Sequence, residues 1–276
     1  MKRMGRFGVP KKYSKIKAMK IALVADMHYG KDINYPNYKG VDYVNNLGKT
    51  LKDKGQEVSE HLKKYDLVVN LGDVFANQTH ENDRENFREA LKFLGDLGRP
   101  VIHVIGNHES HRITHAELAE DIGQAHTYYS LDAGGFHHVV LHTVRESESS
   151  ANPYLVGDEQ MKWLAEDLKE TALKTLVYVH VPIDEQSLAD NYYFSEHPER
   201  GLVENRKEIR AVLEAQGNVL AVFSGHLHFY HMETINGIPY ITVPSISEND
   251  GAGKPFMQYL SVALEGEKIS FETVKI

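Results

Sequence analysis

The sequence of 276 residues predicts a layered α/β fold. Short apolar runs of strand length alternate with longer amphipathic stretches, which is typical of α/β folds rather than of all-helical or all-β ones. The C-terminal third instead contains three successive strand-like stretches, and these indicate a second, partly antiparallel sheet. A chain of this length can fold as one unit with a sizeable core, so we expect a single domain over residues 19–276.

Five apolar runs are predicted to be buried strands, because each is rich in β-branched residues and too short for a helix. They span residues 21–25, 67–71, 101–105, 176–179 and 219–223. Between these runs, apolar residues recur on one helical face in three places. The three helical sets are Phe87, Leu91 and Leu94; Met161, Leu164, Ala165 and Leu168; and Ile209, Val212 and Leu213.

The C-terminal strands are expected over residues 240–243, 257–264 and 268–274. Asn236-Gly237 is a typical two-residue hairpin turn, so a further strand is expected near Tyr230. These short connections predict antiparallel pairing in this part of the chain.

Composition narrows the classes of function. The net charge of -8 would repel a nucleic-acid backbone, which disfavours a general duplex-binding role. The chain has no cysteine, so a metal site must use nitrogen and oxygen ligands. Residues 1–18 are basic and lack the apolar run of a secretory signal, so we interpret them as a solvated N-terminal extension. No stretch is long and apolar enough for a bilayer, and we expect a cytoplasmic protein without a membrane partner.

Polar residues follow each of the five predicted buried strands. Because the carboxyl ends of strands in an open α/β sheet meet at one edge, we expect these side chains to surround one point. The Asp-x-His and His-x-His spacings suit chelation, since residues two apart in an extended segment point to the same side. Glycines before three of the polar residues permit tight turns. The strand-end sequences are Ala25-Asp26-Met27-His28, Leu71-Gly72-Asp73, Gly106-Asn107-His108-Glu109, His180-Val181-Pro182 and Ser224-Gly225-His226-Leu227-His228.

Each of these residues also has a simple structural explanation. A lone histidine at a strand end is usually a hydrogen-bonded structural residue, and aspartate and asparagine are common in turns. Their joint order and placement favour a functional site. His137, His138 and His142 lie on an alternating, strand-like stretch and are assigned to packing. For His111 and His115, a place near a helix start at Thr114 is favoured over a place in the pocket.

In this order, the five blocks resemble the signature of the calcineurin-like metallophosphoesterases, which reads Asp-x-His, Gly-Asp, Gly-Asn-His, a lone His and Gly-His-x-His. The resemblance covers roughly residues 20–245. It includes the stretch around Trp163, which looks like the helix before the lone histidine in phosphodiesterase and purple-phosphatase-like branches. Together with the predicted elements, it implies a layered α-β-β-α sandwich with two mixed central sheets.

The resemblance implies two divalent metal ions, with manganese the first choice and iron or zinc the alternatives. His108 would contact the scissile phosphate and protonate the leaving group, and Asn107 would help to position the substrate. Glu109 is a candidate for orienting His108. The implied ligands are Asp26, His28 and His228 for the first metal, Asn107, His180 and His226 for the second, and Asp73 as the bridge.

Residues 190–200 lie between two of the ligand blocks. This stretch could cover the substrate, and a merely solvated loop explains it equally well. Its candidate residues are Tyr192, Tyr193, Phe194, His197 and Arg200.

The resemblance to the phosphodiesterase and purple-phosphatase-like branches implies hydrolysis of a phosphodiester or nucleotide-type phosphate, with a metal-bridging hydroxide as the nucleophile. A purple iron site is not expected, because Val74-Phe75-Ala76 follows Asp73 without the tyrosine ligand. The closest rival is a manganese-dependent nuclease: His28-Tyr29-Gly30-Lys31 resembles the phosphoesterase part of double-strand-break repair nucleases, but the chain is short for their DNA-capping region. A non-catalytic scaffold such as the retromer subunit tends to lack metal-site residues, and none is missing here.

Overall fold

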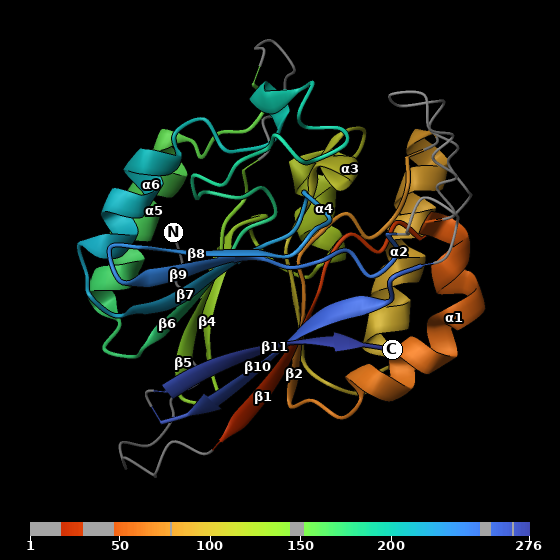
Figure 1. Ribbon diagram of the computed structural model, residues 1–276, viewed down its shortest axis with the longest axis horizontal. Helices are drawn as coiled ribbons and strands as arrows, with labels where there is room; N and C mark the ends of the chain where they lie inside the picture. The colour runs from red at the N-terminus through yellow and green to blue at the C-terminus, as the bar shows by residue number, and fades with distance from the viewer. Residues whose placement is uncertain (1–17, 30–46, 78, 144–151, 249–254, 267) are drawn as a thin grey trace.

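The computed structural model describes residues 18–29, 47–77, 79–143, 152–248, 255–266 and 268–276. The expected N-terminal extension lies outside the described residues except for Ala18. Within the described residues, two mixed sheets pack face to face with helices on both outer sides (Figure 1). The predicted α-β-β-α sandwich is confirmed.

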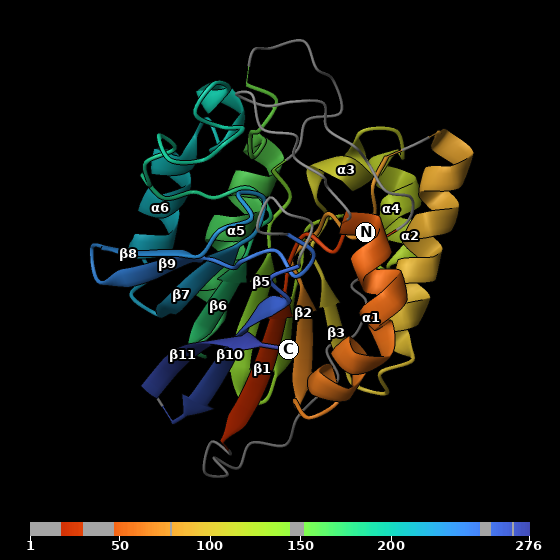
Figure 2. The same ribbon diagram turned by 45° about the vertical axis from the view of Figure 1, so that its right-hand side comes forward.

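The first sheet has five strands in the order β11-β10-β1-β2-β3. Strands β1, β2 and β3 are parallel, and β10 pairs antiparallel with both β1 and β11. Figure 2 shows the three parallel strands beside the helices α1 and α2. The bounds are β1 Met19–Val24, β2 Leu67–Asn70, β3 Val101–His103, β10 Gln258–Glu265 and β11 Lys268–Lys275.

The second sheet has six strands in the order β4-β5-β6-β7-β9-β8. Strands β5, β6, β7 and β9 are parallel, and the two edge strands β4 and β8 are antiparallel to their neighbours. As predicted, Asn236-Gly237 connects β8 to β9, and both residues have positive φ. The bounds are β4 Tyr129–Ala133, β5 Phe136–Val140, β6 Thr175–Tyr178, β7 Val219–Ser224, β8 His231–Ile235 and β9 Ile238–Thr242.

Six α-helices occur in the described chain, and the three predicted from periodicity are α2, α5 and α6. Thr79 caps α2, and Phe87, Ala90 and Leu94 form its buried face. The helix start expected at Thr114 is confirmed by α4, which Thr114 caps, whereas the helices α1 and α3 and the strand β4 were not anticipated from the sequence. The bounds are α1 Leu47–Leu62, α2 His80–Gly95, α3 Asn107–Ser110, α4 His115–Asp121, α5 Asp158–Glu170 and α6 Arg206–Glu214.

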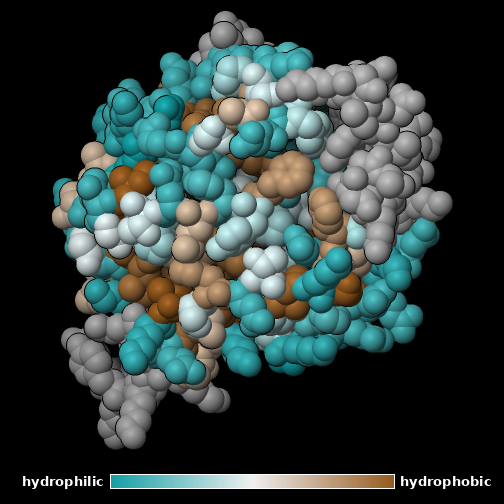
Figure 3. Space-filling view, viewed as in Figure 1, coloured by the Kyte–Doolittle hydropathy of each residue, from teal (hydrophilic) through white to brown (hydrophobic). Residues whose placement is uncertain are grey.

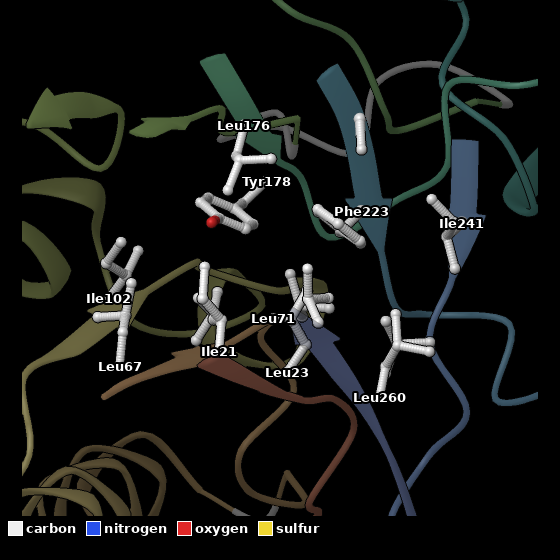
Figure 4. Close-up of a cluster of buried hydrophobic side chains, with 14 of the residues drawn as sticks. Ile21, Leu23, Leu67, Leu71, Ile102, Leu176, Tyr178, Phe223, Ile241 and Leu260 are labelled. Carbon is white, nitrogen blue, oxygen red and sulfur yellow. The ribbon is translucent and has the colours of Figure 1, made fainter. Parts of the chain in front are cut away.

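The core between the sheets explains the continuous apolar runs. Ile21 and Leu23 of β1 point into the cluster that Tyr178 and Phe223 fill from the second sheet (Figure 4). Alternate residues such as Val24 pack instead against the helices outside the first sheet. A third cluster lies between the second sheet and the helices α5 and α6. A strand buried on both faces must be apolar at every position.

On the surface, hydrophilic residues cover most of the face shown in Figure 3, and apolar residues form small patches between them. No helix in the described part of the chain is both long enough and apolar enough to cross a bilayer.

Candidate metal centre

All seven predicted ligands meet at the ends of strands, and these strands belong to both sheets. Asp26 follows β1 and Asp73 follows β2 in the first sheet, whereas His180 and His226 follow β6 and β7 in the second. The expectation of one sheet edge was therefore incomplete, because facing edges of two sheets form the site. Ligand atoms lie within 4.8 Å of one another in three groups: Asp26, His28 and His228; His28, Asp73 and His108; and Asp73, His180 and His226.

The backbone at the ligands is not extended, as the Asp-x-His and His-x-His interpretation assumed. Asp26, His28, Asp73, His226 and His228 have φ between 45° and 71°, and they are five of the seven described non-glycine residues with positive φ. This left-handed conformation is disfavoured for residues with a Cβ. Strained backbone of this kind persists where surrounding structure holds it, and it clusters at functional sites. Left-handed turns, not strand pleating, thus bring each pair of ligands together.

Hydrogen bonds join the two sheets across the site. The amide of His226 donates to both carboxylate oxygens of Asp26, at 3.1 and 3.0 Å. From the same sheet, Nδ1 of His180 donates to the carbonyl of Leu71 at 2.8 Å. Gly225 allows this close approach, because a Cβ there would lie 2.8 Å from Oδ2 of Asp26. The positions of Asp26, His226 and His180 consequently depend on contacts with the opposite sheet.

Three of the histidines have one ring nitrogen fixed and the other turned toward the site. His226 donates from Nε2 to the carbonyl of Arg200 at 2.8 Å, and Nδ1 of His228 lies 2.7 Å from Oε2 of Glu248. His180, fixed through Nδ1, places Nε2 3.1 Å from Oδ1 of Asn107 and 3.2 Å from Oδ2 of Asp73. Such contacts select the tautomer and orient the ring of a metal-binding histidine.

Ionisable side chains are concentrated in a largely buried site. Burial raises the pKa of the Asp26 carboxyl to about 6, although the neighbouring charges of His228 and His180 oppose this. Burial would also raise the pKa of Asp73, but the positive charges of His180 and His108 hold it well below its usual range. Burial favours neutral histidine, yet the charge of Asp73 raises the pKa of His180 to about 9. The charges of Asp73 and His180 therefore stabilise each other, whereas burial lowers the pKa of His28 and that of His226, the latter to about 3, and favours their neutral form.

The donor set fits divalent cations. His28 and His228 face each other through Nε2 atoms 3.2 Å apart, and at least one of these nitrogens must present a lone pair rather than a proton. A cation between them would satisfy both nitrogens. Imidazole nitrogen with carboxylate and amide oxygen suits manganese, iron or zinc. The nitrogen- and oxygen-only ligand set predicted from the absence of cysteine is therefore present.

His108 lies on the open side of the ligand cluster. Its side chain is 18% exposed, compared with 3% for Asp73. Its amide donates to Oδ1 of Asp73 at 2.8 Å, and its carbonyl accepts from Asn77 at 2.7 Å. Its ring packs edge-on against His28, with centroids 4.8 Å apart. The backbone contacts thus fix the position of His108, while part of its imidazole remains exposed.

Glu109 has different partners from those expected. Instead of the His108 imidazole, its carboxylate accepts hydrogen bonds from the amides of Gly106, Asp73 and Val74, at 2.7, 3.0 and 2.6 Å. Glu109 is fully buried. Glu109 therefore links the turn that carries Asp73 to the start of α3 through hydrogen bonds.

The loop over residues 190–200 reaches the centre through Phe194 and Tyr192. The ring of Phe194 lies 4.7 Å from that of His226, and the hydroxyl of Tyr192 donates to Glu248 at 3.2 Å. Tyr193 and His197 stack with each other, with centroids 4.9 Å apart. The loop therefore does border the centre, through two of the residues singled out in the sequence, Phe194 and Tyr192.

Glu248 is a site residue that sequence reasoning missed. It is fully buried and contacts both His228 and Tyr192. It lies in the polar segment Ser247-Glu248-Asn249, which carries no periodic or motif signal. Only its burial beside a histidine distinguishes it from a surface glutamate.

Comparisons with known proteins agree with this geometry. The sequence profile described as calcineurin-like phosphoesterase matches residues 19–230. Purple acid phosphatases 21 and 22 of Arabidopsis thaliana are 28% and 25% identical over 67% and 68% of this chain. The chain spans only 42% and 43% of their lengths.

Among solved structures, a dimetal phosphatase from Danio rerio superposes with a TM-score of 0.63 and 19% identity. The match covers 93% of this chain and 98% of that one, and it supports the fold. Because the family profile covers most of the sequence and all five of its blocks meet at one centre, the chain belongs to the calcineurin-like phosphoesterase family.

Proposed function

We propose that this protein hydrolyses phosphodiesters or nucleotide-type phosphate esters with two divalent metal ions, manganese foremost. Membership of the family implies two divalent ions. The observation that carries the proposal is the carboxylate of Asp73, which belongs to two groups of potential ligands, one with His28 and the other with His180 and His226. A shared carboxylate is the arrangement that holds two cations close enough to act on one phosphate.

The two ions would have ligands from both sheets. Bound there, they would supply positive charge for the phosphate and an activated water near neutral pH. The first ion would be held by Asp26, His28 and His228 and the second by Asn107, His180 and His226, with Asp73 shared between them.

Two neighbouring residues have roles of their own in this proposal. Part of the His108 imidazole is exposed beside the centre, so it could donate a proton to the leaving oxygen. Asn107 is the first residue of α3, and its side chain lies beside His180. Its side-chain amide would orient a phosphoryl oxygen. Neither role requires a covalent intermediate on the protein.

A cavity next to the centre supports a small substrate. It has a volume of about 510 Å³ and is lined by Asn152, Gln186, Phe194, Ser195 and Arg206, among others. Phe194 connects it to His226. Cavities of this size commonly hold small organic ligands. The cavity and the net charge of -8 both favour a small phosphate ester over a polynucleotide.

The test is a substrate screen with manganese-loaded protein. Initial rates would be compared for an aryl phosphodiester, an aryl phosphomonoester, cyclic nucleotides, dinucleotide pyrophosphates and single-stranded DNA. We expect the highest kcat/KM on a small diester or nucleotide. Preferential cleavage of single-stranded DNA would replace this proposal with the nuclease alternative. Metal-replete protein that hydrolyses none of these compounds with manganese, iron or zinc would contradict it.

A further inference from the structure

A second group of metal-binding side chains lies away from the proposed centre, between the β8–β9 hairpin and the turn that follows β6. Asp184 comes from the turn, and His231 and Glu233 come from β8. One ligand atom from each of the three lies within 4.8 Å of the others. His231 and Glu233 are two residues apart in a strand, so they share one face. None of the three belongs to the ligand set described above.

Among the described residues, no lysine or arginine forms an ion pair with Asp184 or Glu233, and His231 is the one member of the group that can carry positive charge. Asp184 is 1% exposed, and the donors to the two carboxylates are neutral: Gln186 donates to both oxygens of Asp184, at 3.1 and 2.9 Å, and the amide of Glu185 donates to Glu233 at 2.6 Å. Buried carboxylates without a counter-charge are costly, and such groups are normally paired or metal-bound.

The nearby arginines are engaged elsewhere. Arg206 donates twice to Oε2 of Glu185, at 3.0 and 2.8 Å. Arg210 donates to Oε1 of the same carboxylate at 2.6 Å and also binds the carbonyl of Ile183. Glu185 therefore takes both guanidinium groups, and the adjacent Asp184 takes neither in the described structure.

Two polar atoms beside the group are buried without a hydrogen-bond partner in the described part of the chain: Nε2 of His231 and the hydroxyl of Tyr240. Tyr240 is 2% exposed and pairs with Glu233 across β8 and β9, so both side chains lie on the same face. Burial raises the pKa of Tyr240. The charge of Glu214 adds to this shift and that of Arg210 opposes it, and the charges of Asp184 and Glu233 raise the pKa further. The unpartnered hydroxyl is thus close to both carboxylates.

We propose that Asp184, His231 and Glu233 form a third divalent cation site, which binds zinc or manganese. One imidazole nitrogen and two carboxylate oxygens are a common donor set for these ions. A bound ion would neutralise the two carboxylates and engage His231. It would also fasten the turn containing Gln186 to the hairpin, and Gln186 lines the cavity beside the proposed active site. The role of the site is to stabilise that wall.

The first experiment counts ions in matched proteins. Each would be equilibrated with zinc, dialysed against a weak chelator and analysed by elemental mass spectrometry. We expect Asp184→Asn and His231→Gln each to hold about one ion per chain fewer than wild type, because each loses a ligand of a three-ligand site. For an aryl phosphodiester, kcat should stay within about twofold of wild type, since neither residue touches the proposed centre, and any loss should be in KM, because Gln186 lines the cavity.

A double variant separates this site from the proposed active site. Asp73→Asn removes the shared ligand of the binuclear centre and should leave about one zinc ion per chain, which the addition of Asp184→Asn removes. If Asp184→Asn lowers the zinc count but Asp73→Asn does not, the result supports the third site and contradicts the proposed function. Asp132→Asn is the control, because Asp132 also pairs with a histidine, His137, at the other edge of the same sheet. This control should not change the zinc count.

Equal zinc contents in wild type, Asp184→Asn and His231→Gln would overturn the third site and leave a protonated Asp184 as the explanation of its burial. Circular dichroism would establish that the variants are folded. A crystal of the zinc-loaded protein offers an independent test: anomalous density should lie about 2.0–2.2 Å from the ring of His231 and from a carboxylate oxygen. Density confined to the Asp73 centre would also refute the site.

Discussion

Histidine and aspartate meet in two regions of this molecule, and they do so in different ways. At the strand ends, His180 and His228 each have one ring nitrogen fixed and direct the other toward carboxylates of the centre. At the β4–β5 edge, His137 binds Asp132 through Nδ1 and Asp167 through Nε2, at 2.7 and 2.8 Å. The first arrangement leaves a nitrogen for a ligand, and the second uses both.

The backbone shows the same difference. His228 and four other members of the centre have positive φ, whereas His137 lies in regular antiparallel pairing with Asp132. Disfavoured backbone is retained where the surrounding structure enforces it. Residue type and burial therefore do not distinguish a candidate metal ligand from a structural histidine. The two are distinguished by whether a ring nitrogen is left available and by the conformation of the backbone.

The largest effect is expected from Asp73→Ala. If the strand-end region is the catalytic one, losing the shared ligand should remove bound metal and lower turnover further than the roughly 10²–10⁴-fold that proton transfer alone supplies. Elemental analysis and initial rates on an aryl phosphodiester would measure both. Unchanged metal content would contradict the shared-ligand role. Asp132→Ala, which removes the corresponding partner of His137, should leave both quantities unchanged.

His108→Ala should produce the next largest loss. We expect turnover to fall about 10²–10⁴-fold for a substrate with a poor leaving group, because the proton donor is lost. The loss should be smaller for a nitrophenyl leaving group, which departs without protonation, and bound metal should be retained. Full activity on the poor leaving group would exclude the proposed role of His108.

Glu248→Gln tests the residue that fixes His228. An amide can still accept a hydrogen bond but lacks the charge that strengthens the contact with Nδ1. We expect metal affinity or kcat to fall about 10- to 100-fold. A competing chelator titration would measure the affinity.

The matched control is Tyr192→Phe, which removes the other contact of Glu248 but leaves the carboxylate in place. It should cost much less than Glu248→Gln. Equal losses in the two variants would mean that the loop, rather than the histidine, is what Glu248 supports.

The smallest effect is expected from His137→Gln, and it should concern stability alone. Burial by itself would lower the pKa of His137, but its hydrogen bonds with Asp167 and Asp132 raise it. Because the pKa of His137 is higher in the folded state, its protonation stabilises the folded protein at pH values below the unfolded-state pKa of about 6.5. This contribution is lost as the pH rises through the folded-state pKa.

Denaturant unfolding at several pH values would measure this contribution. The difference in unfolding free energy between wild type and His137→Gln should be largest in acid and shrink above about pH 6.5. Activity at a fixed pH should be equal. Loss of metal from His137→Gln would break the distinction between the two histidine regions.

Much of the fold could be predicted from the sequence. The buried strands and the helices α2, α5 and α6 have strong periodic signals, since their apolar residues face a core on one or both sides. The helix α1 and the strand β4 were missed. Tyr129–Ala133 alternates between partly buried and exposed positions at the edge of its sheet, where the apolar signal is weak.

The sequence by itself determined which residues could serve as ligands, because their types and their places after buried strands are properties of local order. Tertiary structure decided how they meet. Two sheets face each other so that His226 reaches Asp26, and left-handed turns replace the extended geometry inferred from spacing. It also decided the partners of Glu109, the burial of Glu248 and the isolation of Asp184 from Arg210. Contacts between residues that are distant in the chain produce no periodic pattern in the sequence, because only tertiary packing brings these residues together.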